Sequence, residues 1–202
     1  FFYKGNIYKE LFKQKEDQNK QSPYRIIAIE SFKRSLEIEN DGKYSESSKQ
    51  NLKYLAETVY NHAATSLTEA EYEVAVSNYK FYKEIISFAF PNTNFKEKDI
   101  MFNLALATIF SRLAEKDSAS AIKYYPKTIA LFNEVLDIDS NNVSANYNMG
   151  ILYYNQGVDI VNNMDYSLDI EPLNQVQDRI IELFKKSLPY MLKAYDHNPK
   201  RK

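Results

Sequence analysis

Long segments with apolar residues at helical spacing, separated by short polar breaks, constrain the fold of this chain more than any other feature. In one such segment, the apolar residues are Ile26, Ile27, Ile29, Phe32 and Leu36. Intervals of three and four place most of these side chains on one face of an α-helix. The chain has only 4 glycines and 6 prolines, which leaves little material for the tight turns of an all-β fold. We therefore expect an all-α protein.

The polar breaks predict eight helices, and several residues mark where helices begin. The expected helices cover residues 1–14, 23–39, 46–67, 69–90, 97–115, 118–138, 142–163 and 171–197. Ser22 before Pro23 is typical of a helix start, and Thr68 to Glu71 has the form of a capping box. Pro126 and Pro189 fall inside expected helices, where we predict a kink or a helix start. The polar segment 162–171 is expected to be the most mobile part.

Two short signatures recur along the chain. The first consists of an aromatic residue, asparagine, any residue and a small residue, at 60–63, 102–105 and 147–150, with a weaker copy at 2–5. The second is a small residue four positions before a larger one, as in the pairs Ala28/Phe32, Ala75/Tyr79, Thr128/Phe132 and Ser187/Met191. In three copies, the helix is expected to end eight residues further on, at Asn40, Ser140 and Pro199. The alternation of signatures predicts four helical hairpins, approximately 1–40, 45–91, 96–140 and 142–199, in one array over 1–202.

These signatures resemble the tetratricopeptide repeat (TPR), whose pattern is W-x2-L-G-x2-Y, then A-x3-F, then P. Gly5 with Tyr8 and Gly150 with Tyr153 match the G-x2-Y part, and residues 187–199 resemble the second helix of a bacterial-type repeat. The resemblance implies an α-solenoid of about four hairpins in a right-handed superhelix, with small residues where paired helices approach. The small residues of the two signatures lie 23, 12, 23 and 37 residues apart, and only the second gap matches the standard repeat. Three hairpins are therefore expected to be lengthened.

The resemblance also implies a concave groove, lined by the first helix of each hairpin, that takes a peptide or a partner helix. The aromatic residue that opens each first signature would face this groove, together with residues one and two turns along the helix. The candidate groove residues are Phe2, Asn6, Lys9, Glu57, Tyr60, Asn61, Leu67, Asp99, Phe102, Asn103, Leu106, Ile109, Tyr147, Asn148, Ile151 and Tyr154. Two interpretations stay open for the rings, which either bind a partner or fill the repeat interior. The asparagines either bond a ligand backbone or lie on the helix surface.

No pattern of residues indicates catalysis, a metal or a cofactor. The two histidines, His62 and His197, lie far apart, and the chain has no cysteine and no glycine-rich phosphate loop. We expect His62 to be a packed helix residue. A net charge of −1, with the signs mixed along the chain, argues against nucleic-acid binding. The apolar runs are shorter than the ~20 residues that span a bilayer, so no membrane insertion is expected.

The sequence thus predicts a non-catalytic protein–protein interaction scaffold that binds a peptide or partner helix. Two alternatives stay open: a glycan-binding component whose tyrosines stack on sugar rings, and a structural protein that associates with itself. Because the chain begins without Met, inside an expected helix, and ends without an obvious polar capping helix, we expect it to be part of a longer array. The sequence does not distinguish a cytoplasmic from an exported protein.

Overall fold

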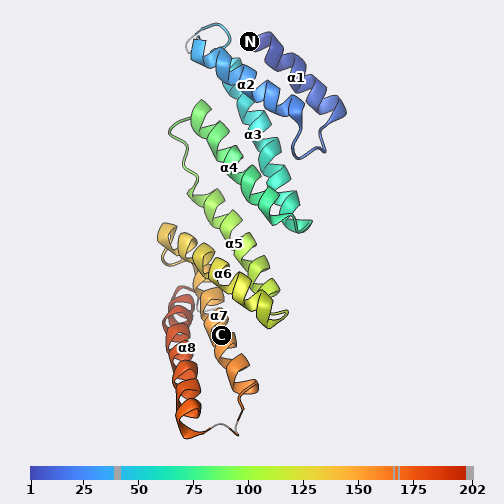
Figure 1. Ribbon diagram of the computed structural model, residues 1–202. Coiled ribbons are helices and arrows are strands. Elements are labelled where there is room, and N and C mark those ends of the chain that lie inside the picture. The colour runs from blue at the N-terminus through green and yellow to red at the C-terminus, as the bar shows by residue number, and fades with distance from the viewer. Residues whose placement is uncertain (39–41, 166, 168, 199–202) are drawn as a thin grey trace. The chain divides into compact units, whose positions relative to one another are not determined.

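The computed structural model describes residues 1–38, 42–165, 167 and 169–198, and these residues form eight α-helices and no strand. The helices are α1 (Phe2–Lys15), α2 (Pro23–Ile38), α3 (Ser45–Thr68), α4 (Tyr72–Ala89), α5 (Lys96–Ala114), α6 (Ser118–Ile138), α7 (Val143–Asn162) and α8 (Ile170–His197) (Figure 1). The predicted all-α class is confirmed, and each expected helix is present. The predicted helix ends at Asn40 and Pro199 lie outside the described residues, and α6 ends at Ile138, shortly before Ser140.

Each helix packs mainly against its neighbour in the chain, so that the helices form hairpins α1–α2, α3–α4, α5–α6 and α7–α8. These hairpins belong to two compact units, Phe1–Phe95 and Lys96–Lys202. In the N-terminal unit α2 also packs against α3, and in the C-terminal unit α6 packs against α7. This pairing is consistent with a helical repeat. The right-handed superhelix and the single array over all 202 residues remain predictions.

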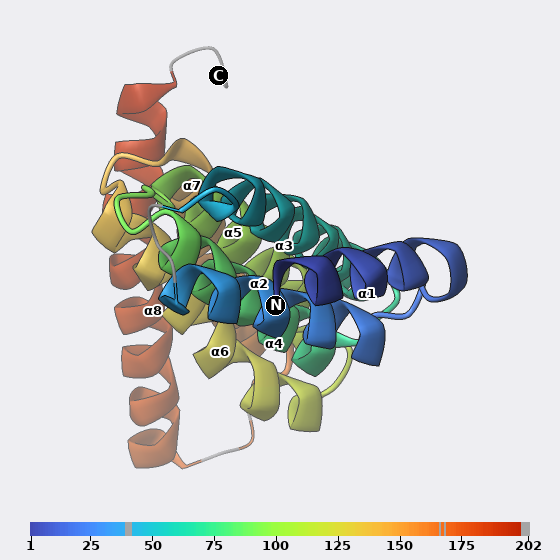
Figure 2. The same cartoon turned by 90° about the horizontal axis from the view of Figure 1, so that it is seen from above.

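Small residues lie where the two helices of the last hairpin approach most closely. Ser187 Oγ donates a hydrogen bond of 2.7 Å to the main-chain oxygen of Gly150, across α7 and α8. A Cβ atom added to Gly150 would lie 2.7 Å from Met191 Cγ. The two signature residues, 37 positions apart in the sequence, therefore face each other as the repeat pattern predicts. Figure 2 shows α8 from above, with the connection from α7 at one end of the helix.

The third copy of the first signature does not follow the expected pattern. Ala63 and Gly150, the small residues of the other two full copies, are buried, whereas Ala105 is exposed. In α5 the buried positions instead include Phe102, at 6% exposure, and Ala107, at 0%. The face of α5 that is buried is thus set by packing, and the match of letters at 102–105 does not correspond to the same position in the hairpin.

The turn between α3 and α4 contradicts the predicted capping box. Thr68 is the last residue of α3, and α4 begins at Tyr72, with Glu71 as an N-cap residue whose side chain makes no capping hydrogen bond. Ala70 has a φ of 62°, and Glu71 N donates to the main-chain oxygen of Ser66 at 2.9 Å. This left-handed residue with its six-to-one bond is the geometry of a Schellman motif, which usually contains glycine. The turn keeps Thr68 inside α3, where its Oγ1 donates to the main-chain oxygen of Thr65 at 2.8 Å, so Thr68 does not cap the first amides of α4.

The predicted start of α2 is confirmed, while the two internal prolines do not start helices. Ser22 Oγ accepts a hydrogen bond of 3.1 Å from the main-chain N–H of Arg25, as an N-cap residue does. Helices α6 and α8 run through Pro126 and Pro189 without a break, and both prolines are exposed. An exposed helix face tolerates the missing amide because water can bond the carbonyl that the amide leaves free. The connection 163–169 includes residues 166 and 168, which lie outside the described residues, and its mobility stays a prediction.

Candidate functional site

In the N-terminal unit, the predicted groove residues are mostly engaged within the unit. On α1, the Phe2 ring stacks on Tyr44 with centroids 4.4 Å apart, and Lys9 Nζ donates to Asn51 Oδ1 at 2.8 Å. The half-buried Tyr60 ring on α3 lies 5.2 Å from the ring of Tyr82. These contacts join α1 to α3 and α3 to α4. The other predicted residues differ in exposure: Asn61 is exposed, Asn6 and Glu57 are half-buried, and Leu67 is buried.

In the C-terminal unit, the structure divides the predicted residues into interior and surface. Phe102 and Leu106 are buried at 6% and 3% exposure, and Asn103 Nδ2 donates to Glu134 Oε2 on α6 at 2.8 Å. Half-buried positions are Asp99, Ile109, Asn148 and Ile151. Tyr147 and Tyr154 are exposed.

Three of the predicted groove residues therefore need correction. Leu67, Phe102 and Leu106 are core residues, because their side chains are almost entirely removed from solvent. A side chain in this state stabilises the fold and offers no surface to a partner. The predicted row of aromatic residues is not a uniform row, because its members range from buried Phe102 to exposed Tyr147.

One of the predicted residues, Tyr147, does line an apolar groove. The groove lies between the first turns of α7 and the last turns of α8 and has a volume of about 320 Å³. Its lining residues are Val143, Tyr147, Met191, Leu192, Ala194 and Tyr195. Four of these, Met191, Leu192, Ala194 and Tyr195, belong to α8, the second helix of the hairpin, where no binding element is predicted from the sequence.

The same residues continue into an exposed apolar stripe along α8. Ile181, Leu188, Leu192 and Tyr195 are all exposed, and successive members are separated by seven, four and three residues. A second stripe, with Ile180, Leu183, Ser187 and Ala194, is the buried face of the same helix. The signal that would have revealed the exposed stripe is in the sequence, because α8 has more apolar positions at helical spacing than one buried face uses.

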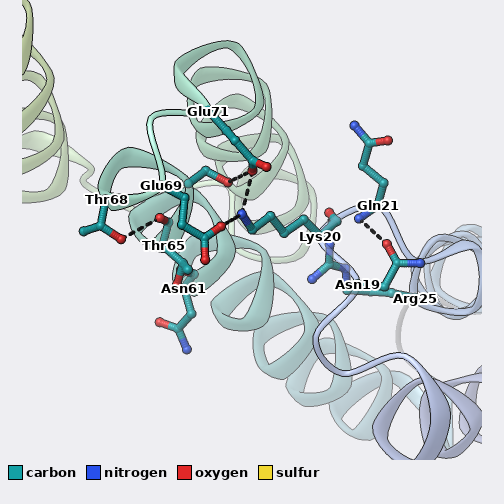
Figure 3. A network of polar contacts seen from close by, with 10 residues as sticks. Asn19, Lys20, Gln21, Arg25, Asn61, Thr65, Thr68, Glu69 and Glu71 are labelled. Atoms are coloured by element: carbon teal, nitrogen blue, oxygen red, sulfur yellow. Dashed lines mark hydrogen bonds and ion pairs between the residues drawn. The ribbon is translucent and has the colours of Figure 1, made fainter.

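A polar cluster holds the N-terminal unit together at the end of the first two hairpins. Lys20, in the α1–α2 connection, reaches between Glu69 and Glu71 of the α3–α4 turn and pairs with both carboxylates (Figure 3). The hydrogen bonds that Lys20 donates to Glu69 and Glu71 raise the pKa of Lys20, and the bond accepted from Lys20 lowers the pKa of Glu71. The left-handed conformation at Ala70 gives the turn the shape that presents both carboxylates to one lysine.

Arg25 lies beside this cluster and is almost completely buried, at 2% exposure. Its Nη2 donates to the main-chain oxygen of Lys20 at 2.6 Å, and its Nη1 lies 2.9 Å from His62 Nδ1. The guanidinium also lies over the Phe12 ring, with 5.3 Å to the centroid. Burial lowers the pKa of Arg25 to about 10. His62 is thus half-buried and in contact with Arg25.

The part of the chain that the structure describes contains no group of three or more His, Cys, Asp or Glu residues that could hold a metal ion. Within the same residues, none of the helices has the length and apolar character needed to cross a membrane. Two features of the described residues suit binding: the apolar groove with its stripe on α8, and the polar region around Arg25.

Comparison with known proteins adds no family to these observations, since no model of a protein family matches the chain and no curated protein is significantly similar to it.

Proposed function

We propose that this chain is a non-catalytic protein-interaction scaffold that binds an amphipathic helix of a protein partner along α8. The observation that supports this function is the exposed stripe Ile181, Leu188, Leu192 and Tyr195, together with the groove beside it. Leu188 and Leu192 are 57% and 53% exposed, which is unusual for adjacent members of one apolar row. The proposal retains a TPR-like α-solenoid as the architecture and replaces the concave aromatic row with this surface.

The spacing of the stripe indicates the shape of the partner. Intervals of seven, four and three are those of the contact positions between two packed helices, whereas an extended peptide would need a period of two. From Ile181 to Tyr195 the helix rises by about 21 Å, or roughly four turns, which is enough for several anchor residues. The partner that we propose is therefore a helix with its own apolar stripe.

The groove supplies a place for one large anchor side chain. Tyr147 of α7 and Tyr195 of α8 line it from opposite helices, and the remaining lining is aliphatic or Met191. Tyrosine is enriched among the residues that dominate binding energy at protein interfaces, because it buries a large rigid surface and keeps a polar end. An aromatic or long aliphatic side chain of the partner helix would bury apolar surface here.

The experiment begins with a photo-crosslinking amino acid in place of Leu188, in a native cell extract, and identifies the crosslinked peptide by mass spectrometry. A synthetic peptide of that segment is then titrated into the protein. We expect the peptide to gain helicity by circular dichroism on binding, and the double variant Leu188→Lys, Leu192→Lys to bind at least about tenfold more weakly. The matched control is Met101→Lys, Ile122→Lys, which changes two exposed apolar residues of α5 and α6 in the same way.

Four outcomes would contradict the proposal. If the crosslinked segment binds without becoming helical, the stripe is not a binding site for a helix. Equal binding by both double variants would lead to the same conclusion. A mass by light scattering that doubles with concentration, and returns to one chain in the lysine variant, would identify a second copy as the occupant. A change in tyrosine fluorescence with oligosaccharides, lost in Tyr147→Ala, would favour glycan binding.

A further inference from the structure

A cavity of about 330 Å³ lies within the N-terminal unit, between the α1–α2 connection, α2 and α4. This volume is at the lower end of the range for small-molecule sites. Its polar lining includes Lys20, Gln21, Arg25 and Asn78, and no carboxylate is among the described residues that line it. The cavity therefore offers hydrogen-bond donors and positive charge, and selects for a ligand with acceptor oxygens.

Two buried donors in residues that line this cavity have no acceptor in the described part of the protein. These donors are Arg25 Nε and Asn78 Nδ2, in side chains that are 2% and 8% exposed. A buried donor without an acceptor costs about 1–3 kcal/mol, and native proteins contain few of them. Two such donors from different helices at one cavity point to a ligand that accepts from both.

The charges around the cavity favour an anion. Among the described residues, no carboxylate lies within 4.0 Å of the Arg25 guanidinium, although a buried charge normally has a partner. Lys20 is already paired with the carboxylates of Glu69 and Glu71. Among the described residues, the Arg25 guanidinium contacts neutral groups: His62, Thr58, the main-chain oxygen of Lys20 and the face of the Phe12 ring.

We propose that this cavity binds a small monocarboxylate with an apolar tail. One carboxylate oxygen would accept from Arg25 Nε–H and the other from Asn78 Nδ2–H, while the tail packs against Ile26, Val74 and Phe81. A monoanion with two oxygens matches the two open donors and the single charge of Arg25, whereas a phosphate has more charge and more acceptor oxygens than this pair of donors. Because both donor atoms are covered, entry requires a side chain at the rim, such as the exposed Gln21, to change rotamer.

The test is a titration of the ¹⁵N-labelled protein with 3-methylbutanoate, followed by NMR. The side-chain Nε–H of Arg25 and the side-chain amide of Asn78 are observed directly. We expect both signals to shift in a saturable way with 3-methylbutanoate and to stay unchanged with 3-methylbutanamide, the neutral ligand of the same shape. Equal shifts with the amide, or no shift at Arg25 Nε–H, would overturn the proposal. If inorganic phosphate shifts both signals at a lower concentration than 3-methylbutanoate does, the ligand is a phosphate and the proposed ligand class is wrong.

Asn78→Asp provides a second test, since it places a carboxylate of the protein itself at the cavity. We expect this variant to unfold at a higher temperature and to bind 3-methylbutanoate at least about tenfold more weakly. Asn92→Asp, the same change at an exposed position of the same unit, is expected to bind within about twofold of the parent protein. An Asn78→Asp protein that binds as tightly as the parent would contradict the proposal. The cavity belongs to the N-terminal unit and the α8 stripe to the other, so either proposal can fail alone.

Discussion

Arg25 Nη1 and His62 Nδ1 lie 2.9 Å apart, and this contact joins α2 to α3 inside the N-terminal unit. A guanidinium can only donate, so Nδ1 of His62 must be the acceptor and the imidazole must be neutral. The bond between the two side chains is thus available only when His62 carries no proton on Nδ1. The sequence predicts that His62 is a packed helix residue, and the structure shows that its Nδ1 also lies within hydrogen-bond distance of the buried Arg25 guanidinium.

The first prediction is that stability falls as pH drops below the ordinary histidine range. Burial and the charge of Arg25 lower the pKa of His62 from 6.5 in the folded protein. Between 6.5 and that lower pKa, the unfolded chain binds a proton that the folded chain does not, so the free energy of unfolding decreases as the pH falls. The stabilising contribution is therefore present above pH 6.5 and is lost as pH falls toward the folded pKa.

Urea unfolding at pH 7.5, 6.5 and 5.5 measures this effect. His62→Gln retains an acceptor for Arg25 and does not titrate, so its midpoint is expected to change less with pH, with a cost below about 1 kcal/mol at pH 7.5. His197→Gln, the same change at the exposed histidine near the end of α8, should keep the pH dependence of the parent. If the urea midpoints of His62→Gln and the parent change equally with pH, His62 is not the titrating group.

The second prediction concerns the close approach of α7 and α8. Alanine is favoured over glycine within a helix by about 1 kcal/mol, yet the Cβ atom of Gly150→Ala would meet the main-chain N of Met191 at 3.3 Å as well as its side chain. The two helices would have to separate, and we expect a net loss of about 1–3 kcal/mol in thermal or urea unfolding. Gly157→Ala is the control on the same helix, because there the three atoms nearest to the new Cβ all belong to the Phe184 ring, and its loss should be smaller.

The third prediction is that Pro126→Ala stabilises the protein by about 1–3 kcal/mol. Helix α6 continues through Pro126, so an alanine there restores a main-chain donor within an otherwise regular helix. Calorimetry of the variant measures the gain. Pro23→Ala replaces a proline in the first position of α2, where a main-chain N–H has no acceptor within the helix. It should change stability by less than about 0.5 kcal/mol. An unchanged or lower transition temperature for Pro126→Ala would contradict this account.

The fourth prediction follows from the left-handed residue in the α3–α4 turn. Ala70 has a φ of 62°, a conformation that costs an L-residue about 1–2 kcal/mol and glycine very little. Glycine also gains entropy in the unfolded chain, which offsets part of this relief. We therefore expect Ala70→Gly to raise the free energy of unfolding by up to about 1 kcal/mol. Ala64→Gly, at an exposed position inside α3, should instead lower it by about 1 kcal/mol. The same sign for both variants would exclude relief of strain at Ala70.

The sequence by itself determined the helices and the pairing of small residues. Helical periodicity is a local property, since residues three and four apart share a face whatever the rest of the chain does. The Ser22 cap is local for the same reason. The link between Gly150 and Ser187, 37 residues apart, could be predicted because small residues are needed wherever two paired helices approach closely.

The tertiary structure decided which faces are buried and which groups meet. Phe102 is in the core although its signature matches Tyr60 and Tyr147, because burial depends on the helices that pack against α5. Arg25, His62 and Lys20 come together from α2, α3 and the α1–α2 connection, and no short motif joins them. The sequence of α8 has more apolar positions than one buried face uses, but which of them are exposed is decided by the packing of that helix. Periodicity within a helix defines its faces, but the packing of distant segments determines which of those faces remains available for binding.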